Sequence, residues 1–177
     1  MNIPRICLTG VESTGKSTLA PRLAAHFGGM VMPEFGRTHA ELFGTDFTPD
    51  VLLAIAHGHR AGLAAIEAMA PRLIIEDTDI VTTAAWARML HGGSTLLAKI
   101  PATAGLYLLF APDVPFIADG TRQFGGADRK RFQAMIEAEF EERRITPVPI
   151  GGDFEAREAQ AIAAIQNWLL HTPMPGA

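Results

Sequence analysis

The stretch "LTGVESTGKSTLA", residues 8–20, gives the strongest indication of the fold of this chain. Gly10, Gly15, Lys16 and Ser17 complete the pattern G-x-x-x-x-G-K-[ST], with an apolar strand candidate before it and a helix candidate after it. Successive backbone N–H groups in such a turn form an anion-binding nest, and the helix N-terminus adds its dipole. The pattern therefore predicts a loop that binds the phosphates of ATP or GTP, formed by Gly10, Glu12, Ser13, Thr14, Gly15, Lys16, Ser17 and Thr18.

Short apolar runs alternate with helix-like segments along the rest of the chain. Strands are expected at residues 5–10, 30–35, 72–79, 105–112 and 146–150, and helices at 16–27, 48–70, 80–91, 94–100, 127–144 and 154–170. This alternation predicts an α/β fold, a three-layer αβα P-loop NTPase fold with a five-stranded, mostly parallel sheet. The length fits one domain over residues 1–171, followed by a flexible tail at 172–177.

Composition excludes several classes of protein. The chain has 177 residues, 48% of them apolar, and a formal net charge of −4. A general nucleic-acid binder usually carries a basic patch, and no long basic run is found, so we expect no nucleic-acid partner. The longest apolar stretch, residues 51–70, is interrupted by four polar or charged residues and predicts a packed helix, with no membrane partner. The lone Cys7 cannot form an internal disulfide, which fits a cytoplasmic protein.

Ligands of parallel sheets bind at the carboxyl ends of the strands, so the residues that follow each strand are candidates for the site. The third strand ends in acids, and we expect Asp77 to hold Mg²⁺ together with the Ser17 hydroxyl. Asp79 is expected to cap the next helix, to contact substrate, or both. After the second strand, Glu34 is predicted to accept a proton from a substrate hydroxyl or to orient it, and Arg37 to pair with a phosphate or carboxylate.

The polar, glycine-rich segment after the fourth strand, about residues 116–130, is predicted to be a lid that closes over the phosphates. Arg122 is the expected lid cation, which would neutralise charge during phosphate transfer. Arg129, Lys130 and Arg131 are interpreted as a solvated helix face.

Two helices carry weaker signals. Trp86 falls on a helical apolar stripe and is expected in the core. Gly58 and Gly62, four residues apart, are expected to allow close approach of a neighbouring helix or a ligand.

Four segments together resemble one family, the ribosylnicotinamide kinase domain of bacterial NadR-type proteins. They are "GVESTGKS" (10–17), "EFGR" (34–37), "DTDIVTT" (77–83) and "DVPFIADGTRQFG" (113–125), and they occur in the family's order over nearly the whole chain. The resemblance implies ATP- and Mg²⁺-dependent phosphorylation of the 5′-hydroxyl of nicotinamide riboside. It also implies a substrate-binding role for Glu34, Arg37, Asp79 and Asp119. The DNA-binding and adenylyltransferase parts of NadR proteins are not expected in a chain of this length.

The chain departs from the family at three aromatic positions. Pro33 stands where the family commonly has Trp, which helps to pack the nicotinamide ring, and Gly62 is the nearest match to a second ring-packing aromatic. Phe116 stands where the family usually has another Trp. These differences leave open another nucleoside or metabolite as acceptor. Two further alternatives are a module that binds and slowly hydrolyses ATP, and a nucleoside monophosphate kinase. A homo-oligomer also stays open.

Overall fold

The computed structural model describes residues 3–117 and 125–172. Its centre is a five-stranded sheet with the order β2-β3-β1-β4-β5, and every neighbouring pair is parallel. The strands are β1 (Arg5–Gly10), β2 (Met30–Met32), β3 (Ile74–Asp77), β4 (Leu106–Phe110) and β5 (Val148–Ile150). The predicted α/β fold is confirmed, and the sheet is entirely parallel within the described residues.

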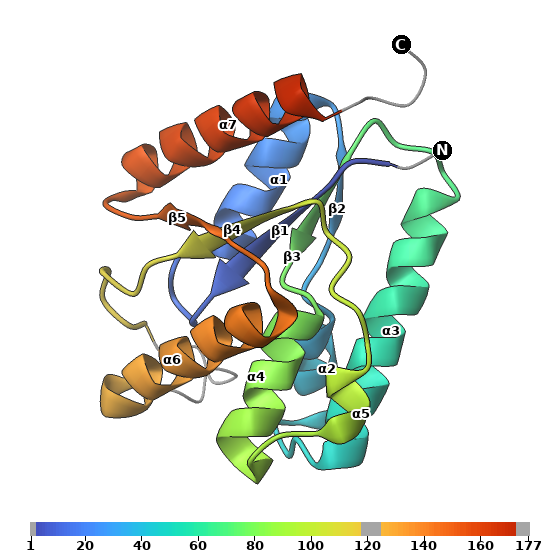
Figure 1. Ribbon diagram of the computed structural model, residues 1–177, viewed down its shortest axis with the longest axis vertical. Helices are drawn as coiled ribbons and strands as arrows, with labels where there is room; N and C mark the ends of the chain where they lie inside the picture. The colour runs from blue at the N-terminus through green and yellow to red at the C-terminus, as the bar shows by residue number, and fades with distance from the viewer. Residues whose placement is uncertain (1–2, 118–124, 173–177) are drawn as a thin grey trace.

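Seven described helices accompany the sheet: α1 (Lys16–Phe27), α2 (Phe35–Phe43), α3 (Pro49–Glu67), α4 (Ile80–His91), α5 (Thr95–Ala98), α6 (Gly126–Arg143) and α7 (Phe154–His171). Figure 1 shows α1 and α7 on one face of the sheet, and α3, α4 and α6 on the other. Alternation along β1 explains this layering, because successive side chains of a strand point to opposite faces. Ile6 and Leu8 pack in the core under α1 and α7, whereas Cys7 packs with residues of α4 and α6.

Local sequence signals start and end several of these helices. The Thr48 side chain accepts a hydrogen bond from the N–H of Val51, as predicted for a cap, and Pro49 occupies the first turn of α3. Ser94 caps α5 in the same way. Among the described residues, no helix combines the length and the apolar character that a membrane span requires.

The glycines of α3 allow close approach of side chains from neighbouring elements, a helix at Gly58, as expected, and a strand at Gly62. A Cβ at Gly58 would lie 2.2 Å from the ring of Phe35, and one at Gly62 would lie 2.9 Å from the terminal carbon of Met32. The close neighbours of these glycines are therefore residues of β2 and α2.

Helix α2 was not predicted from the sequence. The second strand was expected over residues 30–35, but it ends at Met32, and α2 begins at Phe35 with Glu34 as its N-cap. The helix brings the functional candidates Glu34 and Arg37 into one turn, three residues apart.

Candidate active site

The loop between β1 and α1 has the backbone geometry that the glycine pattern predicts. Gly10 has a φ of +140°, and a Cβ there would lie 2.6 Å from the carbonyl oxygen of Phe110. Gly15 caps α1 with a φ of +87°. Lys16 Nζ donates to the carbonyl oxygen of Val11 at 2.8 Å and to Thr14 Oγ1 at 3.3 Å. The loop therefore wraps around the lysine ammonium at the N-terminus of a long helix, where anions bind.

Two buried arginines hold this loop from other parts of the chain. Arg129 of α6 donates to the carbonyl oxygen of Glu12 at 3.1 Å, and Arg157 of α7 donates to that of Thr14 at 3.2 Å. A planar trans peptide points its C=O and the following N–H in opposite directions. These bonds therefore also fix the directions of the N–H groups of Ser13 and Gly15.

The prediction that Arg129 lies on a solvated helix face is wrong, because Arg129 is buried and only Lys130 and Arg131 are exposed. The first turn of α6 packs over the phosphate loop, where Arg129 also donates to the carbonyl oxygen of Val114 at 2.6 Å. Residues 126–130 of the predicted lid thus belong to α6. The expected lid cation Arg122 and the substrate-binding candidate Asp119 lie outside the described residues.

Arg157 was not singled out from the sequence. It is 1% exposed, and it also donates to the carbonyl oxygens of Gly152 (2.7 Å) and Ala111 (3.1 Å) and pairs with Asp113. One guanidinium thereby joins the phosphate loop to the segments after β4 and β5. A sequence gives little signal for such a role, because the bonded groups lie 46 and 143 residues away.

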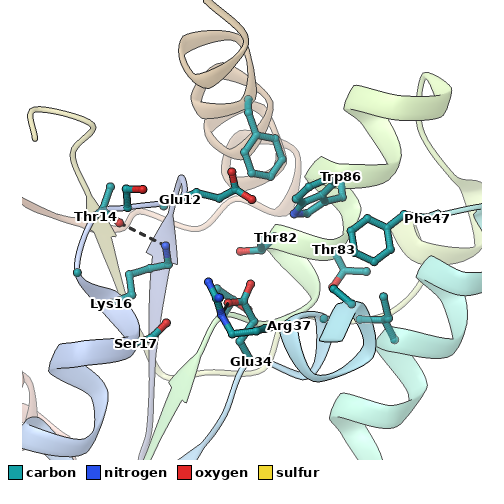
Figure 2. Close-up of a pocket in the computed structure, with 18 of the residues that line it drawn as sticks. Glu12, Thr14, Lys16, Ser17, Glu34, Arg37, Phe47, Thr82, Thr83 and Trp86 are labelled. Carbon is teal, nitrogen blue, oxygen red and sulfur yellow. Dashed lines mark hydrogen bonds and ion pairs between the residues drawn. The ribbon is translucent and has the colours of Figure 1, made fainter. Parts of the chain in front are cut away.

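A continuous pocket runs from the phosphate loop to an aromatic wall formed by Trp86 and Phe47 (Figure 2). Its residues come from the loop, α2, α3, α4 and α6, and from the segment before α3. Figure 2 shows Lys16 and Ser17 at one end, Glu34 and Arg37 in the middle, and Trp86 and Phe47 at the other end.

The middle of the pocket gathers charged groups around the phosphate loop. Glu34 and Arg37 form an ion pair with Nε and Oε2 3.5 Å apart. Burial, together with the Asp77 carboxylate, raises the pKa of Glu34 to about 7, against the opposing effect of Lys16 and Arg37. Burial lowers the pKa of Lys16, while Asp77 and Glu34 act in the opposite direction. A carboxyl group with a pKa near neutrality can exchange a proton with a bound hydroxyl.

Asp79 lies away from this pocket. Its Oδ1 accepts a hydrogen bond from the N–H of Val81 at 2.9 Å, so the predicted capping role is confirmed, and its Oδ2 accepts from the Tyr107 hydroxyl at 2.7 Å. Asp79 lines a second cavity, together with the hydrogen-bonded pair His59 and Glu76. The substrate contact predicted for Asp79 has no support from this placement.

The aromatic wall of the pocket was missed because apolar periodicity does not distinguish a core from a pocket lining. Trp86 was expected in the core, yet it is only partly buried and lines the pocket. It contacts Phe47 and Phe132 edge to face, with ring centroids 5.1 and 5.3 Å apart.

The donor set beside the loop fits Mg²⁺ held together with a nucleotide. Asp77 is buried at the end of β3, and within the described part of the chain its Oδ1 has no hydrogen-bond partner. The Ser17 side chain is exposed at the pocket. The described residues contain no group of three His, Cys, Asp or Glu that could hold a metal ion. One hydroxyl and one carboxylate beside a phosphate-binding loop suit Mg²⁺, which is usually bound by one or two protein oxygens plus substrate phosphates and water.

Comparisons with known proteins agree with this geometry. A family model described as an AAA domain matches residues 5–157. The trifunctional NAD biosynthesis/regulator proteins NadR of Escherichia coli (strain K12) and Salmonella typhimurium are 28% and 27% identical to the chain over 173 residues. Each alignment covers 93% of this chain and 42% of the relative, so the chain spans about two fifths of the length of the curated relatives it matches.

Solved structures confirm the fold. A crystal structure of NadR protein in complex with NR superposes with a TM-score of 0.79 at 20% identity, covering 99% of this chain and 52% of that chain. Thymidylate kinase from Ehrlichia chaffeensis superposes with a TM-score of 0.71 at 14% identity, covering 94% of this chain and all of the kinase. The resemblance to NadR seen in the motifs is therefore confirmed, and the fold is that of P-loop kinases.

Proposed function

We propose that this chain, which belongs to the AAA domain family, is an ATP-dependent phosphotransferase of the nucleoside-kinase type. The acceptor is the 5′-hydroxyl of a riboside, with nicotinamide riboside as the first candidate and nicotinamide mononucleotide as its product. Similarity to NadR over 93% of the chain and the shared P-loop kinase fold support this reading. The similar NadR structure contains NR, which supports the choice of acceptor.

The placement of Glu34 in the pocket of the phosphate loop is the strongest support for this reaction. Glu34, with its pKa raised to about 7, lies in the same pocket as the phosphate loop and beside Arg37. A nucleotide-binding switch needs the loop, but it has no need for a near-neutral carboxyl group next to it. A kinase uses such a group to accept the proton of the acceptor hydroxyl.

The transfer is an in-line displacement at the γ-phosphorus. The acceptor oxygen forms a bond to this phosphorus while the bond to the β–γ bridging oxygen breaks, and ADP leaves with that electron pair. The hydroxyl proton passes to Glu34 Oε. Lys16 and the N–H groups of the loop hold the phosphate oxygens, and Arg37 lies on the acceptor side to pair with charge that develops there. Mg²⁺, held by Ser17 and Asp77, would supply charge neutralisation at the phosphates.

The experiment that separates this proposal from an ATP-hydrolysing module is the acceptor dependence of ADP release. A kinase releases ADP much faster when its riboside is present, because the acceptor hydroxyl replaces water as the nucleophile. If ADP release with Mg²⁺ and ATP is indifferent to every riboside tested, the hydrolytic module is the better description.

A further inference from the structure

We propose that the end of the pocket away from the phosphate loop is the subsite for the heteroaromatic ring and the sugar of the acceptor. In this assignment Trp86 and Phe47 contact the ring, and Thr82 Oγ1 hydrogen-bonds a sugar hydroxyl. The assignment rests on the proposed function, since it names how the acceptor of that reaction is recognised. Its evidence is a rigid aromatic wall, a buried hydroxyl and the order of groups along the pocket.

The wall is built to receive a flat ring. Trp86 borders the pocket and is fixed by edge-to-face contacts with Phe47, at an interplanar angle of 76°, and with Phe132, at 61°. A side chain already fixed by its neighbours loses little further freedom when a ligand binds. Aromatic surfaces of this kind contact flat rings, and positively charged rings especially well.

Thr82 supplies the polar group of the subsite. Thr82 is buried, with only 5% of the residue exposed. In the part of the chain that the structure describes, its Oγ1 has no hydrogen-bond partner. The next residue, Thr83, uses its hydroxyl inside the helix, where it donates to the carbonyl oxygen of Asp79 at 3.3 Å. A buried hydroxyl without a partner destabilises a fold, so its presence in a pocket wall points to a ligand that bonds to it.

The order of groups along the pocket matches the order of groups in a riboside. Figure 2 shows Lys16 and Ser17 at one end, then Glu34 and Arg37, then Thr82, and finally Trp86 with Phe47. A phosphate on the loop, a reacting 5′-hydroxyl at Glu34, a sugar hydroxyl at Thr82 and a ring at Trp86 follow in that same order. A riboside therefore fits in one direction only, with its reacting hydroxyl toward the loop.

Thr82→Val tests the hydroxyl without changing side-chain shape. Because the hydroxyl has no partner among the residues that the structure describes, we expect the thermal midpoint to stay or rise. The KM for nicotinamide riboside should rise about tenfold, while the KM for ATP should be unchanged. An unchanged riboside KM overturns the assignment of Thr82. A clear fall in the thermal midpoint overturns it as well, because it would show that the hydroxyl stabilises the fold.

Trp86→Leu tests the contact between Trp86 and the acceptor ring. Trp168→Phe is the control, because this other tryptophan packs against Gly105. We expect Trp86→Leu to lower kcat/KM for nicotinamide riboside about tenfold. For methyl riboside, which has the sugar but no heteroaromatic ring, kcat/KM should stay within twofold. Equal losses for both acceptors, or none for either, overturn the ring assignment.

A binding measurement separates failure of the subsite from failure of the proposed function. In the Trp168→Phe variant the remaining tryptophan is Trp86, whose fluorescence should be quenched on titration with nicotinamide riboside without ATP, and not with methyl riboside. Quenching without any phosphorylated product supports the subsite and contradicts the proposed kinase activity. Absence of quenching by nicotinamide riboside, uridine and cytidine overturns the subsite.

Discussion

The guanidinium of Arg37 lies 3.5 Å from the carboxylate of Glu34, and the two side chains come from one turn of α2. Although this cation and Lys16 favour the ionised form, burial and the Asp77 carboxylate prevail and the pKa of Glu34 rises to about 7. The pair therefore places a carboxyl group that titrates near neutrality beside a fixed positive charge. It is this arrangement that gives the proposed reaction a proton acceptor.

The activity should depend on pH through the ionisation of Glu34. Because the ionised form of Glu34 accepts the proton, kcat/KM for the riboside, which reports the free enzyme, should rise as pH increases through about 7. Glu34→Gln should lower kcat by 10²- to 10⁴-fold and abolish that rise. The exposed Glu41 on the same helix provides the control, and Glu41→Gln should leave the profile unchanged. A wild-type pH profile in Glu34→Gln would remove Glu34 from the mechanism.

The same pKa shift predicts a change in stability that is independent of activity. A carboxyl group whose pKa is raised by folding destabilises the folded state once it ionises, so its contribution becomes less favourable as pH rises from about 4.5 to 7. Glu34→Gln should therefore gain stability relative to wild type over that interval, measured by urea denaturation at a series of pH values. A difference that does not vary with pH would contradict the shift.

The second residue to test is Lys16. Lys16→Met should reduce turnover by at least 10²- to 10³-fold, because it removes a positive charge that acts on the transferred phosphate. Stability should not fall, since burial already disfavours the ammonium and lowers its pKa. Lys99, exposed at the end of α5, serves as the control, and Lys99→Met should keep full activity. Near-normal turnover in Lys16→Met would separate the loop from the chemistry.

The metal assignment predicts a specific change in Mg²⁺ dependence. Asp77→Asn should raise the Mg²⁺ concentration needed for half-maximal activity by about tenfold or more, since a neutral amide is a weaker ligand for a hard cation. Asp50→Asn, at an exposed position in the first turn of α3, should not change it. An unaltered Mg²⁺ requirement in Asp77→Asn would mean that another group holds the ion.

The clamp formed by Arg157 predicts an effect on ATP rather than on the acceptor. Arg157→Lys keeps the charge but loses the planar guanidinium, which bonds to Thr14, Ala111 and Gly152 together. The KM for ATP should therefore rise about tenfold, while the riboside KM stays near wild type. Arg22→Lys is the matched control, because Arg22 pairs with Glu158 at the surface, where ion pairs stabilise by about 0–1 kcal/mol. Equal changes in both KM values would indicate a general structural role.

The sequence predicted the parts of the site whose signal is local. The glycine and lysine spacing of the loop, the Thr48 cap and the acid at the end of β3 each depend on a few adjacent residues, and the structure has the phosphate loop, the cap and the strand end where they were expected. Helix α2 was missed because its first residue, Phe35, was assigned to the strand before it and no helix was expected between that strand and residue 48, although Gly44 ends the helix.

Roles that depend on distant contacts could not be predicted. Arg129 was interpreted as solvated because its neighbours Lys130 and Arg131 are charged, and only the packing of α6 over a loop 117 residues away explains its burial. Trp86 shows the same limit, since helical periodicity indicates a side chain that faces inward and does not reveal that a pocket lies there.

Identification of the reaction product is the strongest test of phosphate transfer to a riboside. The protein is incubated with ATP, Mg²⁺ and a panel of ribosides that includes nicotinamide riboside, and the reaction is followed by ³¹P NMR and mass spectrometry. We predict a riboside 5′-monophosphate formed in equal amount to ADP, with nicotinamide mononucleotide as the main product. ADP and inorganic phosphate without any phosphorylated riboside would contradict the claim that this pocket transfers phosphate to a sugar hydroxyl.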